Sequence, residues 1–384
     1  MSRLKNNRDY LLEGIFKTAL ASLIDTIGRA LSRKRPGGPI DPKKLKKILL
    51  VRLDHIGDLL MTTPALRALR ITYPNAEIHF LVKEVTSEVL KLNPNLDRII
   101  TFNAPWTIAK GKRATPGEII RLISRLRKEK YDCVVDCRAD LREALLSLFT
   151  GAPYRLGYGA RGGGFCFTHP VEYNLEDHEI HRAINLLSPL KITSESDKMD
   201  FIFSADDQDE ADTILREAGI KPGSKLAGIH PGAASPFKRW TEKGFAALGD
   251  MIIENGYQVI FLGGPGERDL LKSITGRMRN STPVIDKMDL KVLGALISRL
   301  DCLICNDSAP SHIAQAVGTR AIVLYGPTHD AITGPVDREQ NQVVRNPVPC
   351  APCWLPGTRF WCKYDLQCWK GLGEERVMKI ALYL

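Results

Sequence analysis

A dense polar turn follows the apolar run 48–51, and leucines at helical spacing begin directly after it. The polar turn contains the charged or titratable residues Arg52, Asp54, His55 and Asp58, and it also contains Gly57. This order predicts a buried parallel strand, a turn and a helix start, and ligands of open α/β sheets bind at such strand ends. Asp58 is then either a helix cap or a general base that takes a proton from an attacking hydroxyl. The residues alone leave both roles open.

A second candidate site follows the apolar run 302–305, where Asp307, Ser308 and Ala309 precede a helical pattern. Small residues at a helix start expose backbone N–H groups, and these groups favour an anion such as a diphosphate. Because Asp and Ser are also favoured helix caps, a plain N-cap is the alternative.

Two loops in the same half of the chain contain further candidate binding residues. Residues 230–240 combine a strand end, small residues and two adjacent cations, so Lys238 could neutralise a phosphate. Residues 263–268 are glycine-rich and include Glu267, whose carboxylate can accept hydrogen bonds from ribose hydroxyls. The alternatives are a solvated turn for the first loop and an acidic first helical turn for the second.

Four cysteines cluster near the end of the chain in the pattern C-x2-C-x8-C-x5-C. They are Cys350, Cys353, Cys362 and Cys368. Four thiolates can hold a structural Zn²⁺, although the pattern has one CxxC pair rather than two. Free or partly paired thiols explain the pattern equally well.

The elements that must position these residues alternate between strand and helix patterns from Lys47 onward. In the first half, strands are predicted at 48–53, 77–82, 98–102 and 133–136, and helices at 58–72, 116–130 and 140–149. In the second half, strands are predicted at 226–230, 259–262, 284–285, 302–305 and 321–324, with helices between them and a last helix at 374–384. This alternation predicts two α/β domains with doubly wound parallel sheets, and the polar stretch 194–198 is a plausible linker.

Length and charge limit the function classes. The 384 residues fit two domains, and no apolar run reaches the roughly 18 residues that cross a membrane. Residues 1–47 contain 12 Lys and Arg against 4 Asp and Glu, whereas the rest of the chain contains 42 against 40. A basic tail on a nearly neutral body disfavours nucleic acid and favours an anionic surface as a partner. No export signal is evident, so a cytoplasmic, reducing location is expected.

An apolar stripe at helical spacing runs through residues 11–31, next to the basic run 33–35. The pattern is typical of an amphipathic helix that lies on an anionic membrane. A helix packed on the protein body is the alternative, and Asp9, Glu13 and Asp25 weaken the membrane interpretation.

Four segments together resemble the family 9 glycosyltransferases, which are the ADP-heptose:lipopolysaccharide heptosyltransferases and their relatives. The segments are RLDHIGDLLMTTPALRALR, HPGAASPFKRW, GGPGERD and NDSAPSHIAQAVGTRAIVLYGPT, and the resemblance covers roughly residues 46–380. It implies a GT-B fold, in which two Rossmann-like domains with parallel sheets face a cleft. It also implies an inverting transfer that needs no metal for its chemistry.

The resemblance assigns roles residue by residue. It implies that Asp58 is the general base, with Arg52, Asp54, His55 and Gly57 as acceptor-side or supporting residues. It implies donor phosphate contacts for Lys238, Asp307, Ser308, Ala309 and His312, and nucleoside contacts for Glu267 and Met288. Ala309 departs from the family, which usually has glycine there. Alanine would weaken phosphate binding if the position needed a positive φ, whereas an ordinary first helical position accepts it without cost.

The predicted organisation has four parts. They are a basic N-terminal helix and linker at 1–39, an acceptor-side domain at 40–195, a nucleotide-sugar domain at 196–345, and a Cys-rich segment with the last helix at 346–384. The predicted activity moves a sugar, by first choice a heptose from ADP-heptose, onto a lipopolysaccharide core or a related lipid-linked acceptor. The resemblance and the basic tail place this activity at the inner face of the inner membrane. No cofactor is expected besides the ADP-sugar donor.

Two other function classes remain as alternatives. A non-catalytic protein that binds sugar nucleotides or acts as a membrane adaptor is compatible with Ala309. A nicotinamide oxidoreductase on the same kind of sheet requires a glycine fingerprint after the first strand, where this chain has DHIGDLL.

Overall fold

The apolar run before the polar turn forms β1 (Lys47–Arg52), a central strand of a parallel sheet in the first half of the chain. Its residues Ile48, Leu49 and Leu50 are fully buried, because helices cover both faces of a doubly wound sheet. This burial explains why the run is apolar throughout rather than alternating. The structure, a computed structural model, describes residues 23, 25, 26, 28, 38–107, 113–194, 196–354 and 360–382.

The chain divides into two units, Met1–Asp197 and Lys198–Leu384. In the described part of the first unit, six parallel strands lie in the order β3-β2-β1-β4-β5-β6. The strands other than β1 are β2 (Glu77–Val82), β3 (Arg98–Thr101), β4 (Cys133–Asp136), β5 (Tyr154–Tyr158) and β6 (His169–Val171).

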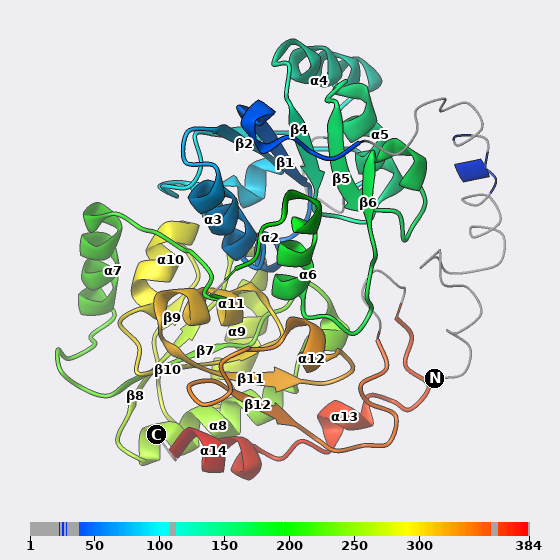
Figure 1. Ribbon diagram of the computed structural model, residues 1–384. Coiled ribbons are helices and arrows are strands. Elements are labelled where there is room, and N and C mark those ends of the chain that lie inside the picture. Colours follow the sequence, from blue (N-terminus) through cyan, green and yellow to red (C-terminus); the bar gives the residue numbers. More distant parts are fainter. Residues whose placement is uncertain are drawn as a thin grey trace. The chain divides into compact units, whose positions relative to one another are not determined.

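The helices of the first unit form two layers. They are α2 (Ile56–Leu60), α3 (Thr63–Thr72), α4 (Pro116–Lys128), α5 (Leu141–Phe149) and α6 (Glu179–Asn185), with 3-10 turns η1 (Pro42–Lys44), η2 (Glu84–Leu90), η3 (Gly164–Cys166) and η4 (Ser188–Leu190). Helices α3 and α6 pack together, and α4 packs with α5. Right-handed crossovers place these two pairs on opposite faces of the sheet (Figure 1).

The second unit repeats this layout with its own parallel sheet, in the order β12-β11-β10-β7-β8-β9 among the described residues. The strands are β7 (Leu226–His230), β8 (Gln258–Leu262), β9 (Val284–Ile285), β10 (Cys302–Asn306), β11 (Arg320–Tyr325) and β12 (Gln342–Arg345). The helices are α7 (Ala205–Glu217), α8 (Glu242–Glu254), α9 (Arg268–Thr275), α10 (Leu290–Ile297), α11 (Ala309–Val317), α12 (Asp330–Thr333), α13 (Gln367–Lys370) and α14 (Glu374–Leu382), with 3-10 turns η5 (Pro236–Lys238) and η6 (Pro265–Glu267). The last helix, α14, packs against α8 in this unit.

The predicted α/β class with two parallel sheets is confirmed, but some elements differ from their predictions. The helix expected at 58–72 is split into α2 and α3. Pro64, the second residue of α3, has no N–H to donate to a carbonyl of the preceding turn, so the hydrogen-bond ladder is interrupted there. The edge strands β6 and β12 were not predicted, because they are short and only partly buried and so lack a long apolar run.

The N-terminal stripe lies mostly outside the described residues, as does the basic run 33–35. Of its described members, Asp25 is buried, and its Oδ1 accepts a hydrogen bond of 2.7 Å from the backbone N–H of Gly163. A Cβ on Gly28 would lie 2.5 Å from the ring of Phe165, so the two residues are in close contact. These residues pack on the first unit, as the alternative to the membrane interpretation expects. Among the described residues, no helix is both long and apolar enough to cross a membrane.

Candidate functional site

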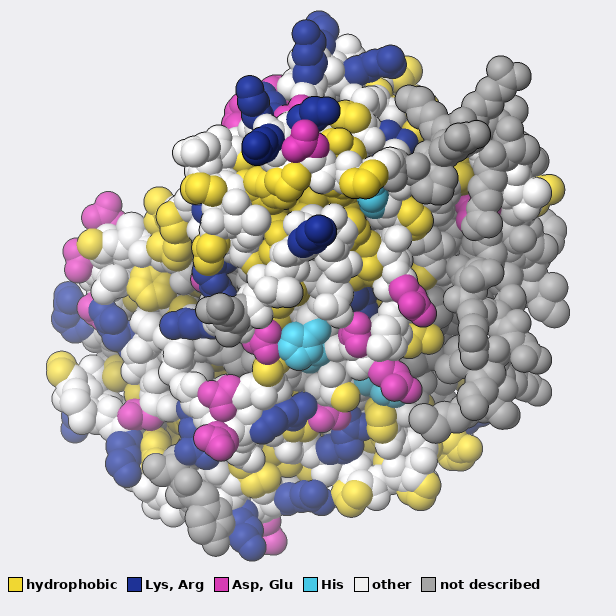
Figure 2. All heavy atoms as spheres, viewed as in Figure 1, with side chains coloured by type: hydrophobic (Ala, Val, Ile, Leu, Met, Phe, Trp, Pro, Cys, Tyr) yellow, Lys and Arg dark blue, Asp and Glu magenta, His cyan; other side chains and the backbone are white. Residues whose placement is uncertain are grey.

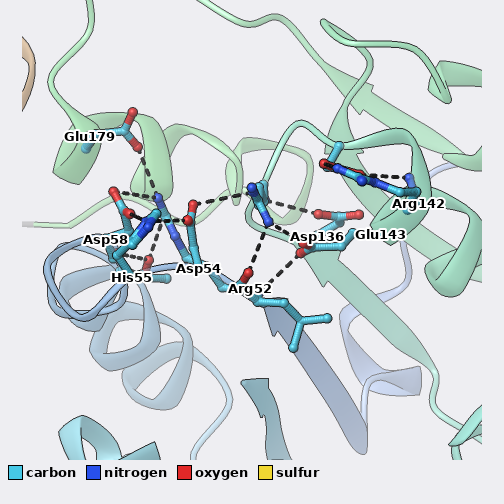
Figure 3. A network of polar contacts seen from close by, with 12 residues as sticks. Arg52, Asp54, His55, Asp58, Asp136, Arg142, Glu143 and Glu179 are labelled. Atoms are coloured by element: carbon cyan, nitrogen blue, oxygen red, sulfur yellow. Dashed lines mark hydrogen bonds and ion pairs between the residues drawn. The ribbon is translucent and has the colours of Figure 1, made fainter. Parts of the chain in front are cut away.

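Asp58 lies in the first turn of α2, whose N-cap position is taken by His55. Arg52 Nη2 lies 3.7 Å from Asp58 Oδ1, and His55 Nδ1 lies 3.3 Å from Asp58 Oδ2 (Figure 3). The Asp58 side chain is 26% exposed, so solvent or a substrate can reach it. Because Asp58 is not at the cap position and each of its oxygens faces a cation, the geometry favours a chemical role over a capping role.

Arg52 connects the end of β1 to α6. Its side chain is buried, its Nη1 donates to Thr62 Oγ1 at 2.9 Å, and its Nη2 lies 3.3 Å from Glu179 Oε2. Burial lowers the pKa of Arg52, but the carboxylates of Asp58 and Glu179 outweigh burial and raise it. Arg52 is therefore a fixed cation that holds the Asp58 carboxylate from one side.

His55 holds the same carboxylate from the other side. Its Nδ1 lies 2.8 Å from Asp54 Oδ1, and hydrogen bonds to Asp54 and Asp58 raise the pKa of His55 to about 9. Burial raises the pKa of Asp54, but the hydrogen bond from His55 and the charge of Arg138 outweigh burial and hold this pKa well below its usual value. At neutral pH the turn therefore contains an imidazolium next to an ionised Asp54.

Asp54, His55 and Asp58 also form the one group among the described residues whose potential metal-ligand atoms lie within 4.8 Å of one another. A metal would bind the neutral form of His55, so it would have to displace the proton that Asp54 and Asp58 stabilise on the ring. Arg52 and Arg138 add further positive charge beside these carboxylates.

A second layer of polar residues, which the sequence pattern did not predict, supports Asp54 from the end of β4. Arg138 Nε lies 3.5 Å from Asp54 Oδ2, while Arg138 Nη1 donates to Glu143 Oε1 and to the Leu53 carbonyl, both at 3.0 Å. Glu143 on α5 is fully buried, and burial raises its pKa to about 7. The available signal was the position of Arg138 two residues after a predicted strand, at the same sheet edge as the turn.

Lys238 and Asp307 meet at the corresponding edge of the second sheet. Lys238 ends η5, and its Nζ lies 2.7 Å from Oδ2 of Asp307, which follows β10 and is 5% exposed. Burial raises the pKa of Asp307, but the charge and hydrogen bond of Lys238 outweigh burial and lower it. His312, buried on α11, also lowers this pKa. Three residues predicted to bind phosphate are thus brought together.

Ser308 is the N-cap residue of α11, and Ala309 is its first helical residue. Ala309 is not among the residues with positive φ, so alanine causes no backbone strain at this position. Pro310 has no N–H, and the Ser311 N–H bonds to the Ser308 carbonyl at 3.0 Å. The N–H groups of Ser308 and Ala309 are therefore the donors that this helix start can offer an anion.

Glu267 lies where the loops after β7 and β8 meet. Its Oε2 accepts a hydrogen bond of 2.9 Å from the Gly264 N–H and lies 3.3 Å from His230 Nε2. Burial raises the pKa of Glu267, but His230 and the Gly264 N–H outweigh burial and lower it to about 2. A Cβ on Gly232 would lie 1.8 Å from Glu267 Oε1, so only glycine allows this approach. Met288 is half-buried and follows β9, at the same edge of the sheet.

The four C-terminal cysteines are free thiols, and Cys368 is buried while Cys353 is exposed. The structure does not bring three of their sulfur atoms within 4.8 Å of one another, and the zinc site stays a prediction. The Sγ of Cys362 accepts hydrogen bonds from the N–H groups of Tyr364 and Leu366, at 3.4 and 3.2 Å.

The Cys-rich segment packs on the loop that carries Lys238. Trp369 Nε1 donates to the Phe237 carbonyl at 2.8 Å, and the rings of Phe237 and Phe360 meet edge to face, 5.1 Å apart. Trp354 stacks on Phe360, and Lys238 Nζ lies 5.8 Å from the centre of the Trp354 ring. These aromatic contacts give the segment a structural role in supporting the loop.

The described residues carry surface charges of both signs. On the face shown in Figure 2, Lys and Arg side chains are interspersed with Asp and Glu side chains rather than gathered into a large area of one sign.

Two Rossmann-like units, one with a carboxylate held between two cations at its strand ends and the other with the Lys238–Asp307 pair beside a helix start, define a glycosyltransferase of the GT-B class. More particularly, the chain belongs to glycosyltransferase family 9 (heptosyltransferase), whose family model matches residues 119–362. The resemblance seen in the sequence is thereby confirmed. Membership of this family excludes the oxidoreductase and the non-catalytic alternatives.

Individual relatives agree with this assignment. The chain is 32% identical to lipopolysaccharide heptosyltransferase 3 of Escherichia coli over 285 residues, which are 71% of this chain and 81% of the relative. A family 9 glycosyltransferase of Veillonella parvula has a similar structure, with a TM-score of 0.75, 24% identity, and coverage of 91% of this chain and 98% of the other. E. coli ADP-heptose lps heptosyltransferase II gives a TM-score of 0.71, 20% identity, and coverage of 88% and 98%.

Proposed function

We propose that this enzyme transfers a heptose from ADP-heptose to a lipopolysaccharide core saccharide, with inversion at the anomeric carbon. The names of two relatives, a lipopolysaccharide heptosyltransferase and an ADP-heptose lps heptosyltransferase, support this donor and acceptor. The observation that carries the proposed chemistry is Asp58, a partly exposed carboxylate held between Arg52 and His55.

In the proposed mechanism, Asp58 takes the proton of the acceptor hydroxyl while that oxygen forms its bond to the anomeric carbon. The bond between this carbon and the diphosphate oxygen breaks in the same displacement, and ADP leaves with the electron pair. Attack from the face opposite the leaving group inverts the configuration.

The proposed stabilisers of the leaving diphosphate are Lys238 and the N–H groups of Ser308 and Ala309. Asp307 and His312 support this group, because the Asp307 carboxylate lies 2.7 Å from Lys238 Nζ and is influenced by the His312 ring. Glu267 is an ionised acceptor for ribose hydroxyls, and Met288 lies at the same sheet edge for contact with the base. The proposal requires no cofactor, because Lys238 supplies the positive charge.

A transfer assay with the full-length enzyme tests this function. With ADP-heptose and a core acceptor that lacks the terminal heptose, we expect ADP release that requires both substrates. NMR of the product should show an anomeric configuration opposite to that of the donor. Retention of configuration would exclude the single displacement. A stronger thermal shift with GDP- or UDP-sugars than with ADP-sugars would overturn the choice of donor.

We further propose that the basic N-terminal segment holds the enzyme at the inner face of the inner membrane, where a lipid-linked acceptor is available. The excess of 12 Lys and Arg over 4 Asp and Glu in residues 1–47 supports this location, while the packing of Asp25 and Gly28 on the first unit limits how much of the helix can face lipid.

Deletion of residues 1–36 should abolish co-sedimentation with vesicles that contain phosphatidylglycerol. The full-length protein should bind these vesicles and leave neutral phosphatidylcholine vesicles unbound, because the attraction depends on anionic lipid. Equal binding by the truncated protein would show that the segment is only a packed helix.

A further inference from the structure

Lys83 is a buried lysine that the proposed mechanism does not use. It directly follows β2 and is the N-cap residue of η2. The turn η2 packs against α2, the short helix that carries Asp58. Lys83 is only 3% exposed as a whole residue, yet its Nζ is not among the fully buried polar atoms that lack a partner, so a small ligand can still reach it.

The ammonium group of Lys83 makes no hydrogen bond or ion pair with any residue that the structure describes. Burial lowers the pKa of Lys83, the nearby carboxylates of Asp54 and Asp58 raise it, and Arg138 lowers it. Buried charges in proteins are normally paired, because desolvation of an unpaired charge is costly. This lysine therefore lies close to the candidate base without a partner of its own.

Arg138 provides a second cation with an unused donor at the same sheet edge. Its Nε and Nη1 atoms contact Asp54, Glu143 and the Leu53 carbonyl, whereas Nη2 has no partner among the described residues. Lys83 follows β2 and Arg138 follows β4, and these are the two strands that flank β1. The positive charges of Lys83 and Arg138 repel each other. Asp54 already contacts His55 and Arg138, and it makes no ion pair with Lys83.

We propose that Lys83 Nζ and Arg138 Nη2 form an anion subsite that binds a carboxylate or phosphate substituent of the acceptor saccharide beside Asp58. An anion there would pair the buried lysine, relieve the repulsion between the cations and use the open guanidinium donor. It would also fix the acceptor ring next to the base. The assignment of the anion to the acceptor rests on the proposed function, whereas the subsite itself does not.

Direct binding tests the subsite independently of transfer. Titrations of the full-length protein with glucose 6-phosphate, gluconate and neutral glucose compare a phosphate, a carboxylate and no charge. We expect at least one of the two anions to bind and glucose not to bind. Lys83→Met should weaken the binding at least tenfold without lowering Tm, because methionine fills the same buried space without a charge. The matched control is Lys91→Met, which removes an exposed lysine from the other end of η2.

Kinetics with the true substrates then separates the two proposals. Lys83→Met should raise KM for the acceptor at least tenfold and leave KM for ADP-heptose unchanged. An acceptor without its anionic group should show the same rise in KM with the wild type, and it should show no further rise with Lys83→Met. Unchanged acceptor KM, a change confined to donor KM, or anion binding that survives in Lys83→Met would overturn the subsite. Absence of transfer by the wild type, with anion binding that depends on Lys83, would overturn the proposed function instead.

Discussion

Asp58→Asn should lower kcat by about 10²- to 10⁴-fold, the range that a general base contributes, while KM for ADP-heptose stays within twofold. Asparagine keeps the size and hydrogen-bonding shape of the side chain but cannot accept the hydroxyl proton. Arg52 keeps Glu179 and Thr62 as partners, and His55 keeps Asp54, so the turn should retain its structure. Steady-state kinetics and isothermal titration with ADP measure the two effects separately.

The matched control for this variant is Asp140→Asn. Asp140 lies at the same edge of the same sheet, after β4, where it is the N-cap residue of α5. Asparagine is also a good N-cap, so this variant should keep activity and lose only the small contribution of the partly exposed ion pair to Arg142. Wild-type activity in Asp58→Asn, or an equal loss of ADP binding and turnover, would remove Asp58 from the role of base.

The strands that carry the candidate site could be predicted because strands buried on both faces are apolar along their whole length. Runs such as 48–51 and 302–305 therefore mark the strands, and the first polar residues after them mark the sheet edge. For this reason Asp58, Lys238 and Asp307 were found from local patterns, and the structure places each at a strand end or in the loop that follows one.

The supporting contacts could not be predicted, because they join residues far apart in the chain. Arg52 contacts Glu179 across 127 positions, and Arg138 contacts the Leu53 carbonyl across 85. Lys83 follows the predicted strand 77–82, but its burial depends on how η2 packs on α2. Sequence patterns show where a strand ends, whereas the partners at that end follow from the order of strands in the sheet.

Lys238→Met should raise KM for ADP-heptose about 10- to 100-fold and also lower kcat. The ammonium group is proposed to neutralise the diphosphate in the bound donor and, more strongly, in the transition state, where charge accumulates on the leaving oxygen. The matched control is Lys243→Met, which removes an exposed lysine from α8 near the same loop. Donor kinetics equal to those of the control would exclude a phosphate contact.

The same variant should also lose stability, because it leaves the buried Asp307 carboxylate without its cation. Loss of one partner from a buried pair costs about 3–5 kcal/mol, and the 27% exposure of Lys238 reduces the expected loss to about 1–2 kcal/mol. Lys238 lowers the pKa of Asp307, so the pair stabilises the fold above the ordinary carboxyl pKa of about 4 and loses this effect as the pH falls below that pKa. The difference in Tm from the wild type should therefore persist from pH 7 to about pH 5 and shrink below about pH 4.

A second substitution separates the effect on stability from the effect on catalysis. Lys238→Met combined with Asp307→Asn removes the unpaired charge, so Tm should return toward the wild-type value at pH 7 while KM for the donor stays high. Recovery of donor KM together with Tm would mean that Lys238 acts only by keeping Asp307 in place. A kinetic defect that persists in the restabilised double variant, and that Asp307→Asn alone does not cause, would instead support direct contact between Lys238 and the diphosphate.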